Sequence, residues 1–117
     1  MAESILTSVK KLLGIESGYT QFDTDIVIHI NSTFAKLDQI GVTPTGEVYE
    51  IATDEDNWED FISDYKAINM VKSYMYASVR LLFDPPATSF GIEALKGQIS
   101  EYEWRMRELQ TLFIPQS

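Results

Sequence analysis

The sequence contains no cysteine, a single histidine, and no lysine or arginine between Lys36 and Lys66. A chain without cysteine forms no disulfide and has no thiol nucleophile or thiolate metal ligand. One imidazole without cysteine partners does not build a usual zinc site, so we interpret His29 as an ordinary helix residue. The sequence also lacks a run of about 18 apolar residues, and its N-terminus lacks a positive start followed by an apolar block. We therefore expect neither a membrane-spanning helix nor a secretory signal.

Catalytic motifs are missing as well. The sequence has no glycine-rich phosphate loop, no nucleophile elbow and no HExxH pattern. The acidic stretch 53–61, TDEDNWEDF, has the composition of a calcium loop. However, a loop counted from Asp54 places Glu59 where glycine is required and Tyr65 where glutamate is required. We expect no metal, no cofactor and no enzymatic activity.

The net charge of −9 is concentrated in one part of the chain. Nine acidic residues lie between Lys36 and Lys66, namely Asp38, Glu47, Glu50, Asp54, Glu55, Asp56, Glu59, Asp60 and Asp64. The other nine acids balance the nine lysines and arginines, so this interval holds the whole excess charge. Phosphate backbones are bound by clusters of basic residues. Specific nucleic-acid binding is therefore not expected.

The length and hydrophobic periodicity predict a single all-α domain spanning residues 1–117. Apolar residues recur at helical spacing in four segments, which we predict as helices at 4–13, 24–40, 64–83 and 89–113. Residues suited to cap or close these helices flank them: Ser4 and Gly14, Asp23 or Thr24 with Gly41, and Ser89. The last helix carries an unbroken heptad seam of Ile92, Leu95, Ile99, Tyr102, Met106, Leu109 and Phe113.

The segments between these helices are harder to interpret. Residues 41–57 are predicted to form a long acidic loop, within which 47–52 has the alternative interpretation of a short strand or half of a β-hairpin. Residues 58–62 suit one helical turn, and 114–117 form a tail. At LLFDPPATSFG, residues 81–91, two prolines end one helix just before the next begins. We therefore expect a helical bundle in which the long C-terminal helix packs antiparallel on the central helix.

Several aromatic residues lie beyond the predicted core stripes. Trp104 is off the heptad seam, and Tyr74 and Tyr76 flank Met75. A helix that is apolar on more than one face has more than one partner, so we predict that these three residues contact another subunit or protein. Simple coverage of a small core is the alternative. Gly97 within the seam has two open interpretations, a close helix–helix approach or plain tolerance.

Several stretches carry a resemblance to a known family. They are ILTSVKKLLGI at 5–15, FDTDIVIHINSTFAKLDQIGV at 22–42, INMVKSYMYASVRLLFDPPATSF at 68–90 and IEALKGQISEYEWRM at 92–106. The RLLFDPP element followed by a capped long helix is the strongest cue. On these stretches the sequence resembles the small head-to-tail connector proteins of long-tailed bacteriophages, the adaptor or head-completion proteins. The resemblance covers most of the chain, although no catalytic motif defines the family.

The resemblance implies an α-helical protein of the virion neck, assembled in the host bacterial cytoplasm. It implies a homo-oligomeric ring of about twelve copies, with different faces meeting in each head-to-tail interface. The ring docks on the portal protein after DNA packaging and contacts a downstream stopper or tail-completion protein. Family members use the C-terminal segment to engage the portal, which carries over to Leu112, Phe113, Ile114 and Pro115. The loop at 42–57 is expected to face neighbouring subunits or the tail side.

An acidic lining would suit a ring through which DNA passes without binding. Like charges repel within a Debye length of about 8–10 Å. We hypothesise that the acidic loop faces such a channel, through Glu47, Glu50, Asp54, Glu55 and Asp56. The alternative function is a small helical regulatory or assembly-chaperone module that binds a single partner protein. A hydrolase-like enzyme would need a pocket of perturbed carboxylates, which the sequence does not suggest.

Overall fold

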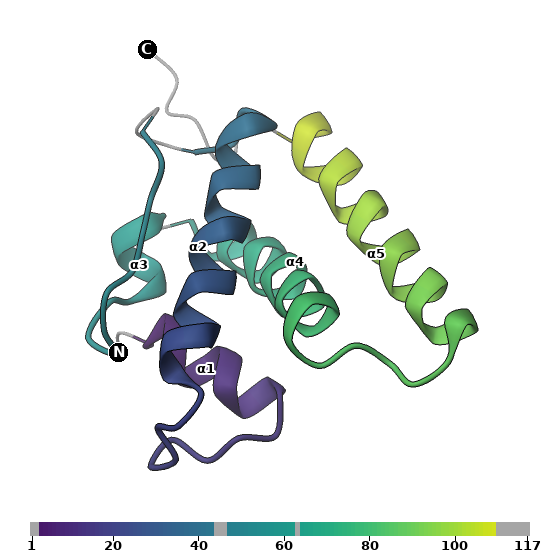
Figure 1. The fold of residues 1–117 in the computed structure, drawn as a ribbon. Coiled ribbons are helices and arrows are strands. Elements are labelled where there is room, and N and C mark those ends of the chain that lie inside the picture. Colours follow the sequence, from purple (N-terminus) through teal and green to yellow (C-terminus); the bar gives the residue numbers. More distant parts are fainter. Residues whose placement is uncertain (1–2, 44–46, 63, 110–117) are drawn as a thin grey trace.

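Five helices make up the fold of the computed structural model, which describes residues 3–43, 47–62 and 64–109, with Tyr65 described by its backbone alone. The helices are α1 (Ile5–Leu12), α2 (Asp23–Gln39), α3 (Trp58–Phe61), α4 (Tyr65–Phe83) and α5 (Ser89–Glu108). No strand occurs in these ranges, and the one bridge of β type joins Ser4 to Asn57. The prediction of an all-α helical bundle is confirmed. In Figure 1, α2 and α4 form the centre, α1 and α3 flank them, and α5 lies at the opposite side from α3.

The predicted helix starts and ends are mostly confirmed, with three corrections. Ser4 caps α1, since its hydroxyl accepts the Thr7 N–H at 3.2 Å. Gly14 and Gly41 follow α1 and α2 with a φ of 81°, a conformation that a glycine adopts without strain. The cap of α5 is Thr88 and not Ser89: the Thr88 hydroxyl accepts the Gly91 N–H at 3.0 Å.

The start of α2 is the second correction. The residue before the helix is Phe22, which has no side-chain cap bond, and Asp23 is already the first helical residue. Asp23 and Asp25 instead lie in the first turn, where carboxylates interact favourably with the positive end of the helix dipole.

The hydrophobic core lies where α1, α2, α3 and α4 meet. The predicted stripe of α2 is fully buried, and its members are Ile26, Ile30, Phe34 and Leu37. Ile5, Leu6 and Val9 of α1, Trp58 and Phe61 of α3, and Ile68, Val71, Met75 and Val79 of α4 complete the centre of this cluster. Leu12 of α1 and Leu82 of α4, each near the C-terminal end of its helix, are exposed. The helical periodicity therefore predicts the core well in the middle of each helix and less well at its ends.

The two prolines lie in the corner between α4 and α5, as predicted. Phe83 is the last residue of α4, and α5 begins at Ser89 and packs against α4 (Figure 1). Of the predicted seam, Leu95 and Met106 are buried, Ile99 and Tyr102 are packed against the core, and Leu109 is exposed. Helix α5 ends at Glu108, earlier than predicted, and Phe113 lies outside the described residues. That the two helices align antiparallel along their whole length stays a prediction.

Candidate interaction surfaces

The described residues 47–62, named here the acidic segment, run along the side of the molecule opposite α5 (Figure 1). Glu47, Glu50, Asp54 and Glu55 are exposed. Asp56 is only partly exposed, because its Oδ2 atom accepts the backbone N–H groups of Ala52 at 2.7 Å and Thr53 at 3.1 Å. Four of the five predicted acidic residues are therefore exposed to solvent. The fifth, Asp56, stabilises a turn within the acidic segment. Whether they face a channel stays a prediction.

Ile51 shows why the predicted strand alternative does not form among the described residues. Its N–H donates to Asn31 Oδ1 at 2.8 Å, and its carbonyl accepts from Asn31 Nδ2 at 3.0 Å. The side-chain amide of a residue on α2 thus supplies both bonds that a neighbouring strand would supply. Ile51 itself is buried in the core. These two hydrogen bonds therefore attach the acidic segment to α2 as extended chain. It has no hairpin partner among the described residues.

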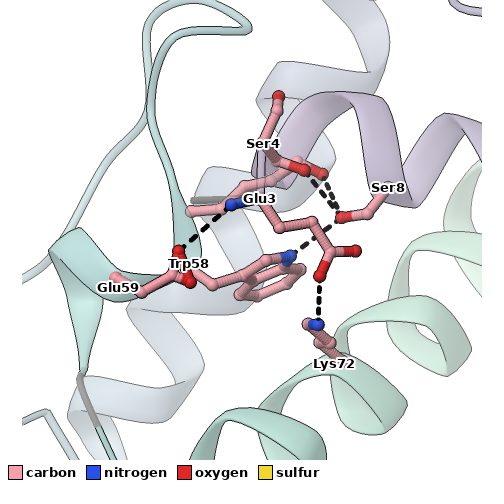
Figure 2. Close-up of polar contacts among 7 residues, drawn as sticks. Glu3, Ser4, Ser8, Trp58, Glu59 and Lys72 are labelled. Carbon is pink, nitrogen blue, oxygen red and sulfur yellow. Dashed lines mark hydrogen bonds and ion pairs between the residues drawn. The ribbon is translucent and has the colours of Figure 1, made fainter. Parts of the chain in front are cut away.

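The N-terminal residues fasten the other end of the acidic segment. The Ile5 N–H donates to the Asp56 carbonyl at 3.0 Å, and the Trp58 N–H donates to the Glu3 carbonyl at 3.1 Å. Figure 2 shows the side chains around this pairing: Trp58 Nε1 donates to Ser8 Oγ at 2.8 Å, and Lys72 Nζ lies 2.5 Å from Glu3 Oε2. The Lys72 ammonium also lies 5.9 Å from the centre of the Trp58 ring. These contacts join α1, α3 and α4, so the exposed carboxylates are carried by a backbone with fixed attachments.

A surface not predicted from the sequence lies between α2 and the acidic segment. It is an open groove of about 420 Å³ lined by Leu6, Asp23, Thr24, Val27, Ile28, Ala52, Thr53 and Asp54. Leu6, Val27 and Ile28 line it with apolar side chains, whereas Asp23 and Asp54 supply carboxylates. Thr24, Val27 and Ile28 share a face of α2, because they are spaced three and four residues apart. This spacing was visible in the sequence, but it did not indicate that residues 52–54 lie opposite that face.

Lys10 fixes one edge of this groove. Its ammonium group is buried and lies 2.7 Å from Asp23 Oδ1. The same group donates to the carbonyls of Ser17 at 3.1 Å and Tyr19 at 2.7 Å. It therefore holds both the connection between α1 and α2 and the first residue of α2.

The outward face of α5 carries two large exposed side chains, Phe90 and Trp104. Phe90, Gly97 and Trp104 are spaced seven residues apart, so they follow one line along the helix. At Gly97 an added Cβ would meet no atom of the described residues within 4 Å, so no described helix of the same chain approaches it closely. A close approach by a helix of another chain stays a prediction. We name this line of three residues the Trp104 face.

The structure separates the three aromatic residues predicted to contact partners. Trp104 is 62% exposed, whereas Tyr74 is fully buried, and Tyr76 is half-buried on α4. The Tyr74 hydroxyl donates to Glu103 Oε2 at 2.7 Å, which joins α4 to α5. Burial, followed by this hydrogen bond and the Glu103 charge, raises the pKa of Tyr74 far above its usual value. In this conformation Tyr74 has no surface to offer a partner, and partner contact by Trp104 and Tyr76 stays a prediction.

Leu112, Phe113, Ile114 and Pro115 lie outside the described residues. Within the described ranges, no group of three or more histidine or acidic side chains is arranged to hold a metal ion. None of the helices over these same ranges is long and apolar enough to cross a bilayer.

Comparison with known families gives this helical arrangement a class. The sequence profile of the phage connector protein family matches residues 5–111, which is most of the chain. The chain belongs to the phage connector protein family. The search of curated proteins and the search of solved structures found no significant match. The family is one of structural proteins of the phage head–tail junction, so the chain has a structural role in the virion neck, and its relatives are not known as enzymes.

Proposed function

We propose that the protein assembles into a homo-oligomeric ring that joins the portal of the phage head to the downstream neck and tail proteins after DNA packaging. Membership of the connector family carries this proposal, because connectors act at the head–tail junction. The described surface supports it: the acidic segment and α5, which carries the exposed Trp104, lie on different sides of the central helices (Figure 1). Head-to-tail interfaces use two different surfaces per subunit, and such interfaces close into rings when the rotation allows.

Stoichiometry tests this proposal against the alternative of a single-partner module. We expect native mass spectrometry of the protein mixed with the portal protein of the same phage to show about twelve copies per portal ring. Electron microscopy of the same sample should show added density on the portal. A one-to-one complex with one partner chain would support the regulatory or chaperone alternative. A chain that stays monomeric with the portal present would overturn the ring.

The proposal assigns roles to two further parts of the chain. The C-terminal residues Leu112, Phe113, Ile114 and Pro115 contact the portal, and removing residues 112–117 is expected to abolish portal binding while the helical circular dichroism remains. The exposed carboxylates of the acidic segment face the DNA path, where like-charge repulsion lets the polymer slide. A ring map with this segment on the outer wall would refute the second role.

A further inference from the structure

We propose that α5 is exchanged between copies in the assembled ring. In this exchange, α5 of one copy lies on α4 of the next, in the place that α5 occupies within a single chain. The inference rests on the ring proposed above and names the contact that closes it. Each copy gives one helix and receives another, so the giving and receiving surfaces differ, as a head-to-tail interface requires. The receiving surface of α4 already fits α5, because the same helix covers it within one chain (Figure 1).

Helix α5 is attached to the bundle along one narrow face. Leu95 and Met106 are its only fully buried side chains, whereas the shorter α2 buries five. It packs mainly against α4, and Phe90 and Trp104 of the Trp104 face are 85% and 62% exposed. Moving α5 therefore uncovers one face of α4 and leaves the packing among α1, α2, α3 and α4 in place.

The corner between α4 and α5 has the properties of a hinge. Four of its five residues at 84–88 are exposed. Its hydrogen bonds go only to the helices that it joins: the Asp84 N–H donates to the Arg80 carbonyl at 2.9 Å, and the Thr88 carbonyl accepts the Ile92 N–H at 3.0 Å. Its two prolines have no N–H to donate. Among the described residues no hydrogen bond joins the corner to α1, α2 or α3, so α5 can swing about it while both helices keep their ends.

The corner is also short and closely packed when α5 folds back on its own chain. A Cβ added at Gly91 would lie 2.8 Å from Pro86 Cβ, so the corner lies tightly against the first turn of α5. Short hinge loops favour the exchange of an element between copies, because the exchanged form opens the tight turn. The contacts between α4 and α5 are the same in both forms. A portal that gathers copies side by side raises the effective concentration of the neighbouring helix and so favours exchange.

Tyr74 and Glu103 identify the occupant of the uncovered face as α5 of another copy. The buried Tyr74 hydroxyl donates to Glu103 Oε2 at 2.7 Å. Loss of one partner leaves a buried polar group unsatisfied, which is unfavourable. A helix that replaces α5 must therefore place a carboxylate at this point between apolar contacts such as Leu95 and Met106. The α5 helix of a second copy carries all of these side chains in the same positions, so the exchange keeps every one of the contacts.

Photo-cross-linking between isotope-labelled copies tests the exchange. Tyr102 is half-buried and packs against the core, and p-benzoylphenylalanine in its place keeps an aromatic ring there. Rings are assembled on the portal of the same phage from equal amounts of unlabelled and heavy-nitrogen-labelled variant, irradiated and digested with trypsin. We expect mixed pairs in mass spectrometry, in which residues 97–105 of one isotope are linked to residues 73–80 of the other. The second peptide holds the buried Tyr74 and Met75, which α5 reaches only by taking its usual place on α4.

Tyr49 supplies the matched control, and the corner supplies a second variant. Tyr49 is also a half-buried tyrosine, and its ring lies 5.0 Å from that of Phe34 and 5.4 Å from that of Phe61, in a part of the chain that is not exchanged. The same substitution at Tyr49 should give linked pairs of one isotope only. Inserting a short glycine-serine stretch between Asp84 and Pro85 lengthens the hinge and lets α5 fold back freely. The fraction of mixed pairs from position 102 should then fall severalfold.

The outcomes separate this inference from the proposed function. Rings on the portal whose links from position 102 are all of one isotope would overturn the exchange and leave the ring intact. Links from position 102 to the portal alone, or a fraction of mixed pairs that the insertion leaves unchanged, would overturn it in the same way. A chain that forms no ring with the portal would overturn both proposals together.

Discussion

Lys10 is a buried cation whose three oxygen partners come from the α1–α2 connection and the first residue of α2. Replacing it by methionine nearly keeps the length of the side chain but removes the N–H donors that the ammonium supplies to these three oxygens. We expect Lys10→Met to lower the free energy of unfolding by about 3 kcal/mol, the lower end for a broken buried pair, because Asp23 keeps some access to water. Chemical denaturation measures the loss.

Lys11 provides the matched control for this change. It is the next residue of α1 and is exposed, so Lys11→Met should alter the free energy of unfolding by no more than about 0.5 kcal/mol. Equal effects of the two substitutions would contradict the role assigned to Lys10. Increased hydrogen exchange at residues 15–23 in the Lys10 variant alone would locate the effect in the connection.

Tyr74 acts at the same scale by joining two helices through one hydroxyl. Tyr74→Phe keeps the buried ring and removes the bond to Glu103. A hydrogen bond to a charged group is worth about 1.5–3 kcal/mol, which is the expected loss of stability. Tyr76→Phe, which alters a half-buried neighbour, should change stability by about 0.5 kcal/mol or less. Urea denaturation distinguishes the two, and an unchanged Tyr74→Phe midpoint would contradict the assignment.

The raised pKa of Tyr74 has a consequence at alkaline pH. In the unfolded chain this phenol loses its proton near its ordinary pKa of about 10, whereas in the folded chain it stays protonated. Above about pH 10 the unfolded state therefore binds fewer protons, and stability falls as pH rises. Tyr74→Phe should remove up to about 1.4 kcal/mol per pH unit of that slope. Burial and nearby Asp56 and Asp60 also raise the pKa of Tyr49, so part of the slope should remain.

At the scale of elements, two glycines of α5 differ sharply in what surrounds them. A Cβ added at Gly97 meets no atom within 4 Å, whereas one added at Gly91 would lie 2.8 Å from Pro86 Cβ and 3.1 Å from Thr88 Oγ1. Gly97→Ala should stabilise the monomer by up to about 1 kcal/mol through helix propensity. Gly91→Ala should gain less or lose stability, because the proline corner must move. Thermal melting of both variants checks this, and equal gains would show that the corner is loosely packed.

Helices and core are the elements that the sequence predicts well. Four residues of α2 at spacings of four, four and three are all buried, because periodicity reports which face of a helix leaves water. The ends are less certain, because a cap depends on local backbone geometry: Thr88 and Ser89 are adjacent and chemically alike, yet Thr88 is the cap. A second apolar line on α5, from Phe90 to Trp104, was visible in the sequence as spacing, but periodicity does not say which line faces the core.

The interaction surfaces were harder to predict than the helices, because they bring together residues that are far apart in the sequence. Nothing in the sequence near Asn31 indicates that its amide takes both hydrogen bonds of Ile51, and that contact stands where the strand alternative for 47–52 would need a neighbouring strand. The groove depends on the same arrangement, since α2 supplies one wall and residues 52–54 supply the other. Tyr74 was predicted to contact a partner, with coverage of the core as the alternative, and the structure places it in the core because α5 covers that side of α4.

At the scale of the whole molecule, the excess negative charge lies on one side. Substitutions in the acidic segment can make the local charge positive. A variant with Glu47, Glu50 and Glu55 changed to lysine keeps its buried residues and reverses three exposed charges. We expect it to retard linear duplex DNA in a gel at low salt, where the parent protein does not. Rings of this variant should also slow DNA release from the head, because the new lysine side chains contact the DNA phosphates that the glutamates would repel.

The control reverses three exposed acids elsewhere, Glu16, Glu93 and Glu108, and so matches the change in net charge. It should leave DNA release at the parental rate. If both variants slow release equally, net charge and not the position of the acidic segment governs the effect. If neither slows it, the segment does not face the DNA path.

The two tryptophans of this chain lie in opposite environments. Trp58 is enclosed beneath the N-terminal residues at 1% exposure, and Trp104 stands in water at 62%. Their fluorescence should consequently separate into a blue, poorly quenched component and a red, readily quenched one. The first would vanish only when the chain unfolds, while the second would shift to the blue whenever the outer side of α5 is covered. One unlabelled emission spectrum could then follow both folding and assembly in the same cuvette.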